Sequence, residues 1–281
     1  MHNPNANALV KPLWSFFDRL NAVYALFFHL HANLRARVAG IEQRSLEKGL
    51  PYAGASIVVA DLTDWQADDT RIKYASGGFA AAGQEYLLLV DKVISWNAGW
   101  TVSQGWERFE SFLKDITASY LEAHPREAST EKLRTHLKKS AQPSTHEDWR
   151  SFLRLYRGTD NKELLDFVRS TAPDFEKAET HNNRNIDLVK WYKVVAKVRH
   201  AVTHSNGLIS AESLQEIDNA LLERLFNGTK EAAAYRLEIS QENTEDALSI
   251  FADYGFALFK ALSMKQGYEW DVLGKGRRKQ S

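Results

Sequence analysis

Apolar residues recur every three or four positions along most of the chain, which is the spacing of amphipathic helices. Glycine and proline are sparse and stand mainly between such segments. The clearest stripe, within 101–122, consists of Trp106, Phe109, Leu113, Ile116 and Tyr120. We therefore expect an all-α fold, a multi-helix bundle with at most one or two short strands.

Turn and capping residues divide this pattern into separate helices. Thr101 and Gln104 have the spacing of a capping box, so we expect a helix to begin there, after a break at Asn97-Ala98-Gly99. The ranges expected to be helical are 12–48, 79–96, 101–122, 131–139, 147–157, 161–169, 186–205, 211–226 and 244–265. The strand candidates are 55–60 and, more strongly, 235–240.

Three parts follow from this organisation. Residues 1–96 form an N-terminal helical segment of unknown role, residues 97–265 form the larger helical domain, and residues 266–281 are a basic tail. The apolar stretch 20–30 is shorter than the ~20 residues that span a bilayer, and residues 1–8 lack the basic start of a secretory signal. We expect a cytoplasmic protein with no membrane partner.

Composition excludes several kinds of chemistry. The chain has no cysteine, so disulfides, thiolate zinc sites, iron–sulfur clusters and cysteine nucleophiles are ruled out. Its 36 basic and 36 acidic residues balance, so any nucleic-acid site must be a local patch. No phosphate-binding glycine loop, HExxH motif or dinucleotide fingerprint is present, and we expect neither a metal nor a cofactor.

The densest group of chemically capable side chains lies at the end of the helix expected over 186–205. Arg199 is followed directly by His200, and His204 stands five positions after Arg199. Asn206-Gly207 would end the helix, with Gly207 in the left-handed position. The core stripe of this helix comprises Leu188, Trp191, Tyr192, Val195, Val198 and Val202.

On a helical wheel Arg199 falls at the edge of that stripe, while His200 and His204 share a face away from it. Arg199 and His204 are about 140° apart around the axis, because each residue advances ~100°. One straight helix therefore does not bring the two side chains together well. Glu110, at the edge of the stripe on 101–122, is a candidate partner for the Arg199 guanidinium.

An arginine, a polar residue and a histidine in this arrangement resemble the signature of the HEPN ribonucleases, arginine and histidine separated by four to six residues. The resemblance is detailed over about ten residues, 198–207, and looser over roughly 100–265; it does not extend to 1–96. It implies a metal-independent endoribonuclease acting on RNA as a homodimer with a composite active site. It also implies a toxin, abortive-infection or antiviral defence role, with an antitoxin or regulatory protein, where there is one, on a separate chain.

These residue types suit RNA cleavage without a metal, in which the 2′-hydroxyl of RNA attacks the adjacent phosphorus. Histidine titrates near ~6.5 and can move the protons at neutral pH, and a guanidinium can stabilise the charge on the phosphorane. We assign His204 as general acid/base, Arg199 as transition-state stabiliser and His200 as phosphate-positioning. Lys193, Lys197 and Asn206 are candidate RNA contacts.

Simpler interpretations stay open. Basic residues are common in the last turn of a helix, so Arg199 and His204 could be a surface ion-pair and capping arrangement. The domain could then be a non-catalytic RNA-binding or dimerisation module, or an adaptor that binds a partner protein through residues 1–96. Trp14, Trp106, Trp149 and Trp191 lie in helical apolar patterns and are expected to be core residues rather than base-stacking ones.

Overall fold

The structure is a computed structural model, in which residues 7–48, 53–55, 58–60, 73–75, 79–81, 83–128, 133, 135, 137, 143–158 and 161–273 are described. The chain forms two compact units, one of Phe27–Asn97 and one of Met1–Leu26 with Ala98–Ser281. Helices α1 (Val10–Lys48) and α2 (Gly83–Ala123) contribute to both. The expected boundary near residue 97 coincides with the limit between the units, but residues before Phe27 belong to the larger one.

The smaller unit combines parts of α1 and α2 with two pairs of short antiparallel strands. β1 (Ala53–Ala55) pairs with β4 (Phe79–Ala81), and β2 (Val58–Ala60) pairs with β3 (Lys73–Ala75). The strand candidate 55–60 therefore corresponds to β2 and the end of β1. The two helices share a buried apolar cluster of Val38, Tyr86, Val90 and Ile94.

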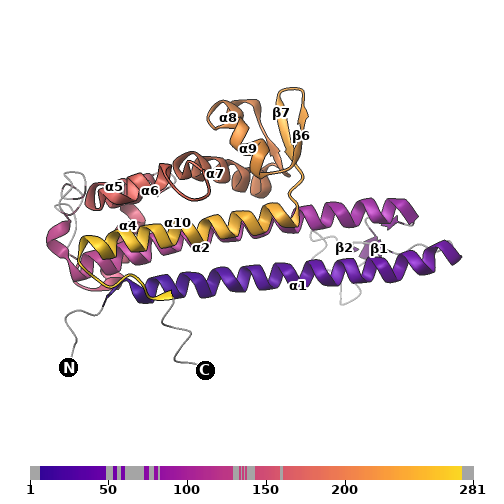
Figure 1. The fold of residues 1–281 in the computed structure, drawn as a ribbon. Coiled ribbons are helices and arrows are strands. Elements are labelled where there is room, and N and C mark those ends of the chain that lie inside the picture. Colours follow the sequence, from indigo (N-terminus) through magenta and orange to yellow (C-terminus); the bar gives the residue numbers. More distant parts are fainter. Residues whose placement is uncertain are drawn as a thin grey trace. The chain divides into compact units, whose positions relative to one another are not determined.

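The larger unit contains most of the chain (Figure 1). After α2 its elements are η1 (Pro125–Glu127), α4 (His146–Tyr156), α5 (Lys162–Thr171), α6 (Pro173–Thr180), α7 (Leu188–His204), β5 (Leu208–Ile209), α8 (Ala211–Gln215), α9 (Asn219–Leu225), β6 (Gly228–Glu231), β7 (Ala234–Leu237) and α10 (Gln241–Lys265). Three strands form an antiparallel sheet in the order β5-β7-β6. The fold is all-α, as expected; strands are more numerous than expected, but those described have at most four residues.

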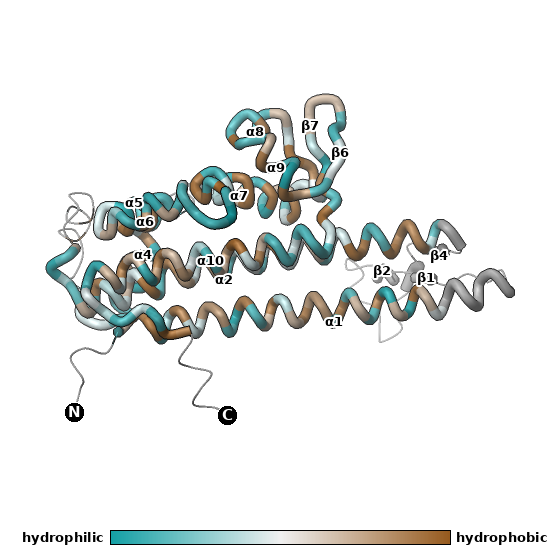
Figure 2. Tube along the Cα trace, in the orientation of Figure 1, coloured by the Kyte–Doolittle hydropathy of each residue, from teal (hydrophilic) through white to brown (hydrophobic). Residues whose placement is uncertain are grey.

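Helix α10 is a core element of this unit. It carries both apolar and polar residues along its length (Figure 2). Its fully buried residues include Phe251, Tyr254, Leu258, Phe259 and Leu262. Glycines let neighbouring helices approach closely. A Cβ atom at Gly105 of α2 would lie 2.6 Å from Leu248 Cδ2, and one at Gly255 of α10 would lie 2.6 Å from Phe16 Cε1 of α1.

Helix α10 is also the one described helix whose length and apolar composition would suit a membrane span. In the structure, 61% of the apolar stretch of α10 is buried inside the protein, and a core helix of this kind meets the same criteria of length and composition.

The expected break at Asn97-Ala98-Gly99 is wrong, because α2 runs without interruption through it. Ala98 and Gly99 are buried, and the two Cγ atoms of Val202 lie 2.8 and 3.2 Å from the place of a Cβ at Gly99. The glycine therefore serves close helix packing rather than a turn. Thr101 is buried within the helix and does not begin it.

Of the other helical predictions, most are confirmed and one is divided into two helices. Those for α1, α4, α5, α7 and α10 are confirmed within a few residues. The range 211–226 is divided into α8 and α9, each begun by a side-chain cap from Ser210 or Asp218. Helix α6 was not predicted. The strand 235–240 is present as β7, two residues shorter. Most of 131–139 and the second half of the basic tail, from residue 274 on, lie outside the described residues.

Candidate active site

Helix α7 carries the predicted site and is held by its apolar face. Asp187 caps its beginning by accepting a hydrogen bond of 3.0 Å from the Lys190 backbone N–H. All six residues of the predicted stripe are buried. Tyr192 stacks on Trp106 of α2 with 4.2 Å between ring centroids, and Trp191 meets Phe251 of α10 edge-on at 4.7 Å. The helix is therefore fixed against both α2 and α10.

The end of α7 is equally well defined. The backbone N–H groups of Ser205 and Gly207 both donate to the Ala201 carbonyl at 2.9 Å. Gly207 has φ 78°, which confirms the left-handed position predicted for it, and Asn206 has φ 50°. The Gly207 carbonyl accepts from the Leu237 N–H of β7, so the sheet ties down the turn that follows the motif.

Arg199 is half-buried at the edge of the apolar face, and its Nε is buried without a hydrogen-bond partner. Within the described residues no carboxylate forms an ion pair with it. By contrast, the partly buried Arg150 and Arg169 pair with Asp115 and Glu179. Arg108 of α2 also has a buried, unpartnered Nε, but no histidine lies within a turn of it along α2. Within the described residues the terminal nitrogens of the Arg199 guanidinium also form no hydrogen bond, so they retain the capacity to bind an anion.

His200 and His204 lie one helical turn apart on the exposed side of α7. Their ring centroids are 5.0 Å apart and their planes are inclined by 48°. Between Arg199 and this pair, the half-buried Thr203 donates through Oγ1 to the Arg199 carbonyl at 2.8 Å. As the helical wheel predicted, the guanidinium and the imidazole of His204 come from different sides of the helix.

The predicted pairing of Glu110 with Arg199 is wrong. Glu110 Oε1 accepts from Asn161 Nδ2 at 2.7 Å and from Arg157 at 3.4 Å. Glu110 lies one residue from Phe109, which packs on Tyr192, whereas Arg199 is seven residues further along α7. The two charges are therefore about two helical turns apart in height, or ~10 Å.

The buried amide that uses Glu110 was not predicted. Asn161 is fully buried, adopts φ 56°, and also donates to the Tyr192 hydroxyl at 3.1 Å. Its position in a polar stretch just before a helix was the available signal, since asparagine tolerates left-handed conformations at helix boundaries. It holds the beginning of α5 against α2 and α7 rather than contributing chemistry.

The candidate RNA contacts differ in availability. Lys197 pairs with Glu216 at 2.8 Å, which neutralises the charge that was expected to attract RNA. Lys190, one turn from Lys193, pairs in the same way with Asp218 at 3.2 Å. Lys193 and Asn206 are exposed, and within the described residues neither forms an ion pair or a side-chain hydrogen bond. The positive charge near the histidines is therefore modest.

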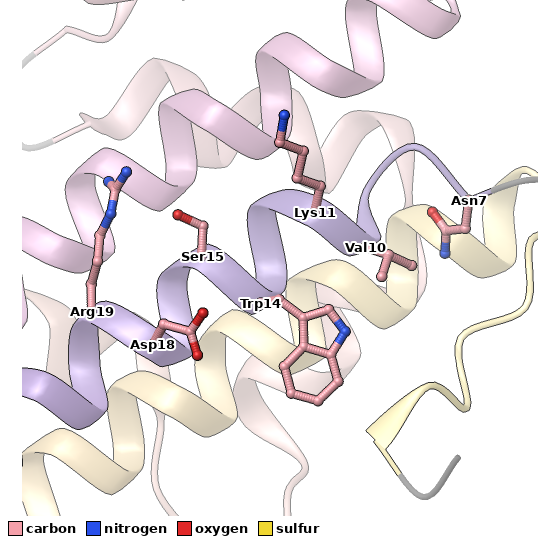
Figure 3. Close-up of a pocket in the computed structure, with 7 residues that line it drawn as sticks. All are labelled: Asn7, Val10, Lys11, Trp14, Ser15, Asp18 and Arg19. Atoms are coloured by element: carbon pink, nitrogen blue, oxygen red, sulfur yellow. The ribbon is translucent and has the colours of Figure 1, made fainter. Parts of the chain in front are cut away.

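A separate depression lies along the beginning of α1 (Figure 3). It is open, and two of its polar members are engaged with residues outside it: Arg19 reaches Asp115 at 3.8 Å, and Asn7 donates to Ser263 at 2.9 Å. Trp14, which was predicted to be a core residue, lies here 37% exposed, because Leu13 and Phe16 form the buried face of α1. Trp106, Trp149 and Trp191 are buried as predicted.

Within the described residues, no group of three or more histidine, aspartate or glutamate side chains is placed to hold a metal ion. No protein-family model, no curated protein and no solved structure matches this chain.

Proposed function

We propose that this protein is a metal-independent endoribonuclease of the HEPN type. The observation that carries the proposal is Arg199: a half-buried guanidinium with a buried, unpartnered Nε, on the same helical end as an exposed histidine pair. A buried polar group without a partner costs about 1–3 kcal/mol, so its presence needs an explanation. A phosphate oxygen is the partner that a planar guanidinium binds best.

In the proposed reaction the 2′-hydroxyl oxygen of RNA bonds to the adjacent phosphorus, and the bond from phosphorus to the 5′ oxygen breaks. The products are a 2′,3′-cyclic phosphate and a 5′-hydroxyl. His204 accepts or donates a proton at these oxygens, an effect worth roughly 10²–10⁴-fold. Arg199 stabilises the negative charge that develops on the phosphorane. His200 positions the phosphate beside His204.

The active site is proposed to be composite, with Arg199 from one copy of the chain and His204 from a second. The separation of about 140° around α7 favours this arrangement over a site on one helix. A symmetric homodimer would contain two such sites, each formed by Arg199 of one copy and His204 of the other. We propose a cytoplasmic role in host defence or as a toxin, with RNA as substrate and any antitoxin or regulatory protein on a separate chain.

The test is cleavage of total RNA and tRNA by the full chain in EDTA, with the products probed for 2′,3′-cyclic phosphate. Wild-type protein is expected to cleave, whereas His204→Ala and Arg199→Lys are not. His181→Ala, which removes an exposed histidine of the loop after α6, is the matched control and is expected to cleave like wild type. Equal cleavage by His204→Ala and wild type would remove His204 from the mechanism. RNA binding without cleavage would favour the non-catalytic module.

A further inference from the structure

The geometry of the histidine pair suits more than proton transfer. His200 and His204 project from successive turns of α7 and are both exposed. Within the described residues, their ring nitrogens form no hydrogen bond or ion pair, and both rings remain available to a ligand. The helix beneath them is held rigidly, because Ala201 and Val202 between them are buried. Two imidazoles presented by one rigid helix form a preorganised chelate.

The distance between the rings fits a single metal ion. Zinc binds histidine nitrogen at ~2.0–2.1 Å, and two imidazoles on one tetrahedral zinc place their ring centroids roughly 5 Å apart. The observed separation is 5.0 Å. The negative end of the helix dipole lies in this last turn and favours a cation. The nearest lysine charge on the preceding turn, Lys197, is paired with Glu216.

We infer that His200 and His204 bind a divalent transition metal, Zn²⁺, as a two-histidine clamp, and that the bound metal inhibits RNA cleavage. The inhibitory part rests on the proposed function, because the metal would occupy the imidazole that is assigned to move the proton. Within the described residues no third protein ligand is placed beside the pair, so water would fill the other positions. Such a site is exchangeable, and its occupancy would follow the zinc concentration.

Binding can be tested without RNA, by calorimetric titration of the metal-stripped full chain with Zn²⁺. Loss of a group that only hydrogen-bonds to a metal ligand typically weakens metal binding 10–100-fold, so removing the ligand itself should do at least that. We expect His200→Ala and His204→Ala each to weaken binding at least tenfold by the same argument. His181→Ala is the control and should bind like wild type. Ni²⁺ should compete for the site and Mg²⁺ should not, since imidazole ligands favour the former.

The second arm measures RNA cleavage by wild type and His200→Ala over a zinc series, each relative to its own zinc-free rate. Wild type should be inhibited in step with binding, and the residual cleavage by His200→Ala should resist the same zinc concentrations. Binding that neither substitution weakens, or no binding, overturns the clamp. Cleavage that persists when the clamp is saturated overturns the inhibition. Histidine-dependent binding by a protein that does not cleave RNA would support the clamp and refute the proposed function instead.

Discussion

Arg169 and Arg199 are both partly buried arginines, but their surroundings differ. Arg169 donates to both oxygens of Glu179, at 2.7 and 2.8 Å, and Glu179 is 1% exposed. Tyr254 donates to the same carboxylate at 2.5 Å. Burial of the Tyr254 hydroxyl, together with the neighbouring Glu179 charge, raises the Tyr254 pKa well above its usual value. This network satisfies a charge in the core. Arg199 has no such counterpart among the described residues, which is why we assign it to a ligand rather than to the fold.

The difference predicts opposite effects on stability. Arg169→Met leaves the Glu179 carboxylate buried without its cation and should lower the free energy of unfolding by about 3–5 kcal/mol. Arg199→Met removes no described ion pair and removes the buried, unpartnered Nε, so it should raise the free energy of unfolding by as much as about 1–3 kcal/mol. Denaturant unfolding of the two variants and wild type measures both values. Equal losses would mean that Arg199 is a structural residue.

The surroundings of His124, directly after α2, lead us to expect that the free energy of unfolding depends on pH. Its Nε2 lies 2.7 Å from the Tyr268 hydroxyl, and burial lowers its pKa, with Glu127 opposing the shift. The unfolded chain therefore takes up this proton at a higher pH than the folded chain does. The contribution to stability is complete above about pH 6.5 and is lost as the pH falls from there through the folded-state pKa.

His124→Gln cannot be protonated at this position and should show a smaller loss of stability between about pH 7 and pH 5 than wild type. Denaturant unfolding at a series of pH values gives the comparison. The same slope for both proteins would show that His124 titrates alike in the folded and unfolded chain.

Between helices, close packing depends on a few small residues. Gly99 of α2 faces Val202, whose branched side chain is stiff about χ1 and cannot turn aside easily. The contact sets the separation of α2 from the helix that carries Arg199 and His204. An added methyl group would therefore strain the support of the site as well as the core.

Gly99→Ala should lower the free energy of unfolding by about 1–3 kcal/mol through overpacking, despite the better helix propensity of alanine. Gly40 of α1 is the matched control, because a Cβ there meets nothing within 4 Å. Gly40→Ala should stabilise its helix by about 0.5–1 kcal/mol. Thermal and denaturant unfolding distinguish the two. A stabilised Gly99→Ala would contradict the packing described between α2 and α7.

The same contact explains what could be predicted from the pattern of residues. Helical spacing identified the apolar faces of α2 and α7 because burial follows directly from periodicity. The role of Gly99 depends on a residue about a hundred positions away, so local turn signals suggested a break instead. Glu110 was misassigned for a related reason: a helical wheel gives the side of a helix but not the height at which another helix crosses it.

For the whole molecule, the larger unit gathers the motif, the core helix α10 and the beginning of α1, while Phe27–Asn97 forms a unit of its own. The proposed chemistry needs only the larger unit and a second copy of it. A composite site would make activity depend on dimer formation. The motif was enough to predict which side chains carry the proposed chemistry. The interface that would complete the site follows neither from the spacing of the motif nor from one copy of the chain.

The most direct test of the account mixes two inactive proteins, Arg199→Ala and His204→Ala, under conditions that allow the subunits to exchange. A mixed dimer would contain one intact site, formed by Arg199 of one copy and His204 of the other. With random exchange, half of the dimers are mixed and one of their two sites is intact, so about a quarter of wild-type cleavage should return. No recovery after demonstrated exchange would contradict a composite site built from these two residues.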